Sequence, residues 1–99
     1  MTERFTLDQF TPLVGQGFRL SYPDYAETLT LVAATPLRFA PGPGLPPGFS
    51  LVFVGESRTV MLGQHLYKLD TDGLGRIDLA LICIGRESEG NFRYQAIVN

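Results

Sequence analysis

The chain has 99 residues, of which 44% are hydrophobic and 18% are charged, and its formal net charge is −2. This balance is typical of one globular domain over residues 1–99, and it excludes an extensively disordered chain. No run of lysines and arginines could neutralise a phosphate backbone, so no nucleic-acid partner is expected. No segment resembles a signal peptide or reaches the roughly 18 apolar residues of a membrane span. A cytoplasmic protein is therefore expected, with later export left open.

A short helix is predicted near the N-terminus. Residues 6–9, Thr-Leu-Asp-Gln, have the form of a capping box. Phe10, Leu13 and Val14 follow at the spacing i, i+3 and i+4, which places them on one apolar face. Gly15 is suited to end the helix. We expect one or two turns, docked against a sheet by Phe10 and Leu13.

From residue 16 onward the apolar period changes to two, which indicates half-buried strands. The first two strands are predicted to form a hairpin with a loop around Asp24–Glu27. Residues 58–64 fit either a strand extension or a segment that crosses one end of the sheet. The predicted strands occupy residues 18–22, 28–33, 49–54, 65–70, 76–85 and 92–98.

Alternation predicts which face each strand buries. In the second strand, Leu29, Leu31 and Ala33 are expected on one face. The central hairpin turns at residues 71–75, Thr-Asp-Gly-Leu-Gly, and its apolar positions are expected to supply much of the core. The connections are short and sequential, so the strands should pair antiparallel. The sequence thus predicts an all-β fold: a small antiparallel six-stranded, partly closed barrel, or a sandwich, with a short N-terminal helix.

The segment from Pro36 to Gly48 contains five prolines and three glycines. This composition excludes a helix and an interior strand, and it favours a stiff surface loop that is partly polyproline II. A minimal Pro-x-x-Pro pattern lies inside it. The loop is the candidate contact surface for a protein partner, with contact residues Arg38, Phe39, Pro41, Pro43, Leu45, Pro46 and Pro47.

The residues that could carry metal or redox chemistry stand alone. His65 is the only histidine and Cys83 the only cysteine. Their separation does not match the spacing of zinc ligands. Asp70 begins a sequence similar to half of a calcium loop, but the twelfth position, where a bidentate Glu is needed, is Leu81. No metal and no cofactor is therefore predicted.

No catalytic residue is predicted, and the protein is expected not to be an enzyme. Residues 55–58, Gly-Glu-Ser-Arg, lack the second glycine of a nucleophile elbow. A hydrolase that uses Ser57 or His65 is the weakest alternative, because it requires these side chains to converge. A second alternative is a small-ligand-binding barrel whose mouth is lined by Tyr22, Tyr67 and Tyr94.

Fragments along nearly the whole chain together resemble a family of small uncharacterised bacterial domains. The matching residues are mostly those of strands and turns. They are 7–10 (LDQF), 13–15 (LVG), 46–53 (PPGFSLVF), 67–69 (YKL), 74–75 (LG), 84–85 (IG) and 94–99 (YQAIVN).

Members of this family look like companions of proteins similar to phage tail-collar and microcystin-dependent proteins, near which they are often encoded. The resemblance implies a structural or accessory role in a phage-tail-like or surface-appendage system, and it implies no catalytic residues. The leading hypothesis is a non-enzymatic protein-interaction module. It would bind a protein partner, or a second copy of itself, through the loop or through an exposed strand edge.

Overall fold

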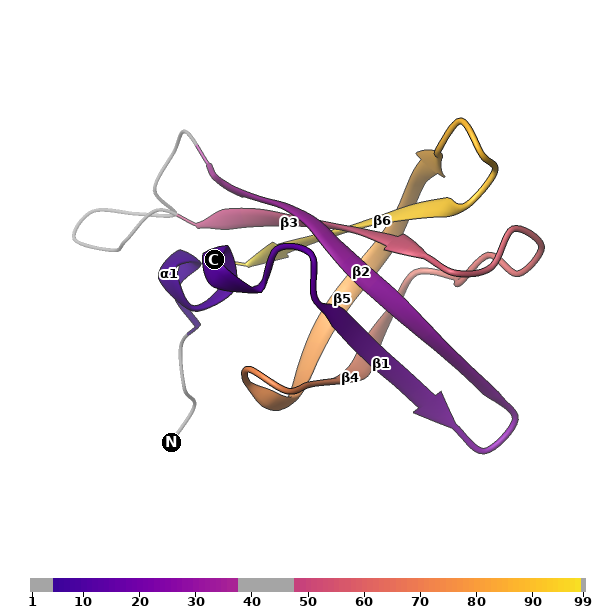
Figure 1. Cartoon of the computed structure of the whole chain (residues 1–99), viewed down its shortest axis with the longest axis horizontal. Helices are drawn as coiled ribbons and strands as arrows, with labels where there is room; N and C mark the ends of the chain where they lie inside the picture. Colours follow the sequence, from indigo (N-terminus) through magenta and orange to yellow (C-terminus); the bar gives the residue numbers. More distant parts are fainter. Residues whose placement is uncertain (1–4, 38–47, 99) are drawn as a thin grey trace.

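The computed structural model describes residues 5–37 and 48–98 (Figure 1). Over these ranges the strands form a closed antiparallel barrel in the order β1-β2-β3-β6-β5-β4. The predicted all-β class, the six-stranded antiparallel barrel and the short N-terminal helix are confirmed. In chain order the elements are α1 (Leu7–Phe10), the 3₁₀ helix η1 (Thr11–Leu13), β1 (Gly17–Tyr22), β2 (Tyr25–Pro36), β3 (Phe49–Gly55), β4 (His65–Thr71), β5 (Gly75–Arg86) and β6 (Phe92–Val98).

The connection from β3 to β4 crosses one end of the barrel. Strand β3 lies between β2 and β6, whereas β4 lies between β5 and β1. Residues 56–64 must therefore pass over the barrel end. Of the two structures expected for residues 58–64, the crossing segment is confirmed and the strand extension is not. Leu62 is buried there, and its N–H donates to the Tyr94 hydroxyl at 2.9 Å. The crossing segment is thus anchored to the barrel interior.

The N-terminal helix covers the opposite end. The N–H of Thr6 donates to Gln9 Oε1 at 2.8 Å, one half of the predicted capping box. Phe10 is fully buried, and its ring lies 5.6 Å from the ring of Phe49 and 6.4 Å from that of Phe18. The expected docking of the helix through Phe10 is confirmed.

Leu13 and Val14, both predicted on the apolar face of the helix, differ in their packing. Leu13 packs against Gly73 in the β4–β5 turn so closely that a Cβ at position 73 would overlap its side chain. Val14, predicted on the same apolar face, is instead 45% exposed. The α-helix gives way to a 3₁₀ helix at Thr11, which takes position 14 out of the helical phase.

Alternating inward residues fill the barrel. In the central hairpin Leu69 faces Ile77 inside, and Lys68 lies opposite Asp78 outside, as the alternation predicts. Phe18 and Phe53 meet edge to face at 5.1 Å. The buried core consists of Phe10, Phe18, Leu20, Leu29, Leu31, Phe49, Leu51, Phe53, Leu62, Leu69, Ile77, Leu79, Leu81, Phe92, Tyr94 and Ala96.

Strand β2 departs from the prediction at both of its ends. The β1–β2 loop contains only Pro23 and Asp24, because Tyr22 already pairs with Tyr25. A bulge between Leu31 and Ala33 then adds one residue relative to β3. Because side chains alternate with period two, this extra residue turns Ala33 outward instead of inward.

Candidate interaction surface

The predicted contact loop lies outside the described residues, and its role stays a prediction. The last described residue before it is Leu37, whose N–H donates to the carbonyl of Gly48 at 2.9 Å. This bond shows that the two ends of the loop meet. The predicted contact residues that lie outside the described ranges are Arg38, Phe39, Pro41, Pro43, Leu45, Pro46 and Pro47.

The hydrolase candidates have separate surroundings. The Ser57 hydroxyl oxygen accepts the N–H groups of Thr59 and Val60 at 3.2 and 2.8 Å, and thus organises its own turn. His65 is exposed, with its ring 5.1 Å from that of Tyr67. No hydrogen bond joins Ser57, His65 and Asp70 to one another in the part of the chain that the structure describes. Nor do any three His, Cys, Asp or Glu side chains there come together as metal ligands.

The three tyrosines expected at a barrel mouth do not share an opening. Tyr94 is 0% exposed and lies inside the barrel. Tyr22 and Tyr67 are half-buried, and their rings meet edge to face at 6.4 Å. A fully buried side chain cannot line a solvent-accessible mouth, so these residues do not form the expected ring of contacts.

A buried carboxylate that sequence reasoning had placed in a loop fastens the crossing segment. Glu27 is 5% exposed. Its Oε1 accepts the Tyr25 hydroxyl at 2.5 Å, and its Oε2 accepts the Ser57 N–H at 3.2 Å. Position 27 is in phase with the inward positions 29 and 31, which is the signal that could have revealed it. Both carboxylate oxygens are engaged within the fold, so Glu27 acts as a structural clamp.

This clamp predicts a loss of stability at alkaline pH. Burial, followed by the hydrogen bond to Glu27 and its negative charge, raises the pKa of Tyr25 from 10.0 to about 12. Because the folded pKa lies above the unfolded value, Tyr25 adds stability that is fully present below pH 10.0 and is lost as the pH rises through about 12. We expect urea denaturation to show the stability difference between the wild type and Tyr25→Phe shrinking over this interval. A difference that stays constant would contradict the linkage.

The outer surface of the barrel carries an exposed aliphatic wall, defined here as Val52, Leu66, Ala80, Ile82 and Ile97. Leu66 of β4 pairs with Ala80 of β5, and Ile82 is the next outward residue of β5. Ile82 and Val52 flank Gln95 of β6 on either side, and Ile97 is the next outward residue of β6.

Three of the wall residues are strongly exposed for aliphatic side chains, whereas Val52 is half-buried. Leu66 is 57% exposed, Ile97 46% and Ile82 39%. Single exposed apolar residues are ordinary, but a contiguous patch on a small protein commonly marks a contact with another molecule. The wall spans four strands that are neighbours in the barrel, so the β-sheet backbone holds it rigid.

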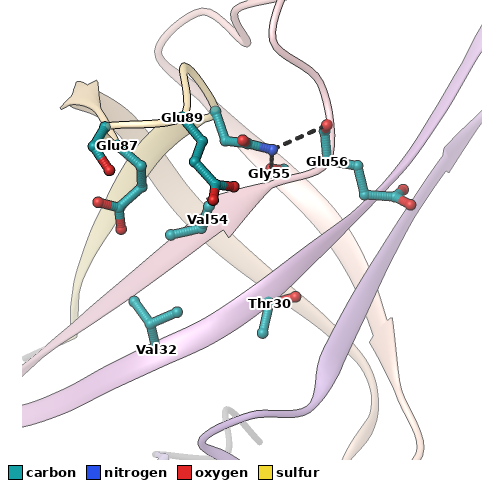
Figure 2. Close-up of a pocket in the computed structure, with 9 residues that line it drawn as sticks. Thr30, Val32, Val54, Gly55, Glu56, Glu87 and Glu89 are labelled. Atoms are coloured by element: carbon teal, nitrogen blue, oxygen red, sulfur yellow. Dashed lines mark hydrogen bonds between the residues drawn. The ribbon is translucent and has the colours of Figure 1, made fainter.

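An acidic groove of about 550 Å³ is lined in part by Val54, which is two positions from the wall residue Val52 in β3. Figure 2 shows Val54 and the β2 residues Thr30 and Val32 on one side, with Glu87 and Glu89 of the β5–β6 turn on the other. Asn91 fixes the turn, because its side-chain N–H groups donate to the carbonyls of Gly55 at 2.9 Å and Glu56 at 3.1 Å.

Fold and surface together define a small closed antiparallel β-barrel with an aliphatic outer wall. The family model described as "Domain of unknown function (DUF6916)" matches residues 5–98, and the chain belongs to this family. The expectation of a small uncharacterised domain is thus confirmed. No curated protein and no solved structure matches the chain. No helix within the described ranges is long and apolar enough to cross a membrane.

Proposed function

We propose that the protein is a non-enzymatic protein-interaction module that makes its main contact through the aliphatic wall. The wall itself carries this proposal: Leu66, Ile82 and Ile97 stay between 39% and 57% exposed on the outside, although the chain has a well-filled interior. Burying exposed aliphatic surface is worth about 25 cal/mol per Å², and it is the usual source of affinity between proteins.

The family resemblance supports a proposal for the biological setting of the module. We propose an accessory of a phage-tail-like or surface-appendage system, located in the cytoplasm before any export. Its partner would be a component of that system or a second copy of the chain. A rigid, closed barrel suits a structural component, because its backbone loses little entropy on assembly.

For the small-ligand alternative, the acidic groove is a better candidate than the barrel interior. The barrel interior is filled by side chains from both ends, with Phe10 at one and Leu62 at the other. The groove, at about 550 Å³, has the volume of a ligand site. Its lining is open and half polar, however, and it contains no histidine or cysteine. The wall therefore supports protein binding better than the groove supports a small ligand.

The double variant Ile82→Thr/Ile97→Thr tests the wall. We expect about tenfold weaker association, because central apolar contacts dominate interface energies. Self-association is measured by size exclusion with light scattering. Binding of another protein is measured by capture from a lysate of the source cells, followed by reconstitution with the purified captured protein.

The matched control is Val14→Thr/Val60→Thr. These valines are 45% and 41% exposed but lie outside the wall. The control should associate like the wild type, and all three proteins should show the same unfolding midpoint. Equal association of the wall variant and the control would refute the wall as the contact. A loss in both would point to general surface hydrophobicity instead.

A further inference from the structure

The barrel is only narrowly closed between its first and fourth strands. Strands β1 and β4 are joined by just two residue pairs, Arg19 with Asp70 and Leu20 with Leu69. Strand β4, however, begins four residues before Leu69, at His65. Residues 65–68 thus pair with β5 on one side and have no strand partner on the other, as far as the described chain extends.

The backbone direction along this edge can be read from one hydrogen bond. The N–H of Lys68 donates to the Tyr22 hydroxyl at 3.2 Å, so it points toward β1 rather than toward β5. Backbone groups of alternate residues in a strand point to the same side. The N–H and C=O of Leu66 therefore also point away from β5. Residues 65–68 present a strand edge that can accept another strand.

The side chains of this edge combine apolar surface with positive charge. Leu66 is 57% exposed. A slot of about 300 Å³ opens beside the edge, and its lining includes two cations, Lys68 and Arg76, together with Asp70, whose carboxylate lies 3.9 Å from Arg19. Neither of these cations has an acidic oxygen within 4 Å among the described residues, although Asp78 lies opposite Lys68 in β5. Arg19, also in the lining, is paired with Asp72 at 2.9 Å.

We propose that the β4 edge, residues 65–68, receives an extended segment of a partner protein by strand addition. The segment carries an aliphatic residue opposite Leu66 and an acidic residue opposite Lys68. Positions 66 and 68 both face outward, so these two residues of the segment are two positions apart on one face. The added strand continues the sheet from Leu66, a member of the aliphatic wall.

The Tyr22 hydroxyl occupies a hydrogen-bonding position that the incoming strand would use. It accepts the Lys68 N–H that strand addition would use. The segment must therefore displace this hydroxyl, and the Tyr22 ring, which carries it, must turn away from its edge-to-face contact with Tyr67. Removing the hydroxyl alone leaves the Lys68 N–H free, so Tyr22→Phe should bind the segment more tightly than the wild type does.

The test uses three synthetic peptides and the isotope-labelled chain. The acidic peptide repeats the sequence Thr-Val-Thr-Glu, so that valine and glutamate lie two positions apart on one face of the strand. The second peptide has lysine in place of glutamate, and the third is the acidic peptide N-methylated at its central residues. Binding is followed by backbone amide NMR titration. We expect the largest shifts at Leu66 and Lys68, about tenfold weaker binding of the lysine peptide, and no binding of the N-methylated peptide.

Two variants of the chain complete the design. Lys68→Glu should reverse the preference between the acidic and lysine peptides, and Tyr22→Phe should strengthen binding of the acidic peptide. The inference is overturned if the acidic peptide does not bind or shifts amides elsewhere. Equal binding of the acidic and lysine peptides also overturns it. Concentration-dependent shifts of the Leu66 amide without peptide would mean that the occupant is a second copy, which overturns the proposed partner chemistry.

This inference rests on the proposed interaction role, but the two can fail separately. The Ile82→Thr/Ile97→Thr variant leaves the β4 edge unchanged and should still bind the acidic peptide. If that variant keeps its associations while the peptide binds at Leu66 and Lys68, the wall fails and the edge stands. If the wall variant loses its associations but no peptide binds, the edge fails and the wall stands.

Discussion

Replacing Phe10 by alanine is expected to lower the free energy of unfolding by about 3–5 kcal/mol, the usual cost of truncating a buried phenylalanine. The ring is fully buried and lies against those of Phe5, Phe18 and Phe49. Its removal would leave a cavity at the barrel end that the short α1 helix cannot close. Urea denaturation followed by far-UV circular dichroism measures the loss.

Val14→Ala is the matched control for this substitution. Val14 is 45% exposed and lies only four residues further along the same segment. Its truncation should change stability by no more than about 0.5 kcal/mol, as is usual on the surface. If Phe10→Ala unfolds with a cost as small as that of Val14→Ala, the N-terminal segment is not part of the folded core.

Local sequence signals predicted those parts of the fold that depend on neighbouring residues. The capping sequence at residues 6–9 starts a helix because Gln9 can reach back to the N–H of Thr6. The three-residue turn of the central hairpin, residues 72–74, is followed by Gly75 with a φ of 72°, and it sets the register that pairs Leu69 with Ile77. Both are short-range interactions, and the residues that make them are close in sequence.

The features that sequence reasoning missed depend on a partner strand distant in sequence. The bulge in β2 exists only relative to β3, so the alternation within β2 could not reveal that Ala33 turns outward. Glu27 was assigned to the loop between the first two strands, and a charged side chain is rarely buried unless it is paired. Its burial becomes favourable only with two hydrogen-bond donors, one of which belongs to Ser57, 30 residues further along the chain.

The aliphatic wall could not be predicted from the sequence for a related reason. Each of its residues is an ordinary outward position in its own strand. Only the strand order β3-β6-β5-β4 brings Val52, Ile97, Ile82 and Leu66 together on the outer surface, with Gln95 between Val52 and Ile82. The sequence did suggest an exposed strand edge as one contact. The fold leaves such an edge in residues 65–68, because closure of the barrel needs only two residue pairs between β1 and β4.

Wall and edge could act together, since Leu66 belongs to both. A strand added at residues 65–68 would enlarge the sheet at the margin of the wall and bury Leu66. A partner that combines an extended segment with an apolar surface would thereby gain affinity from both features. The contribution of each would then depend on the other, so variants at Leu66 should not be additive with variants at Ile82.

Glu27→Ala is expected to cost about 2–3 kcal/mol of stability, the sum of one orphaned backbone donor and one weakened hydroxyl contact. The Ser57 N–H would lose its acceptor at a half-buried position, and the Tyr25 hydroxyl would lose its hydrogen bond of 2.5 Å. Because Ser57 is the second residue of the crossing segment, residues 56–64 should also loosen locally. Hydrogen exchange should therefore accelerate at Leu62, which this segment presents to Tyr94.

Glu27→Gln separates hydrogen bonding from charge. The amide oxygen can still accept the Ser57 N–H, and the Tyr25 hydroxyl can rotate to accept from the amide nitrogen. We expect a cost of at most about 1 kcal/mol, with slow exchange kept at Leu62. A glutamine variant as unstable as the alanine variant would show that the negative charge itself, rather than the pair of hydrogen bonds, holds the crossing segment. A stable alanine variant would show that the clamp contributes little to the closure of this barrel end.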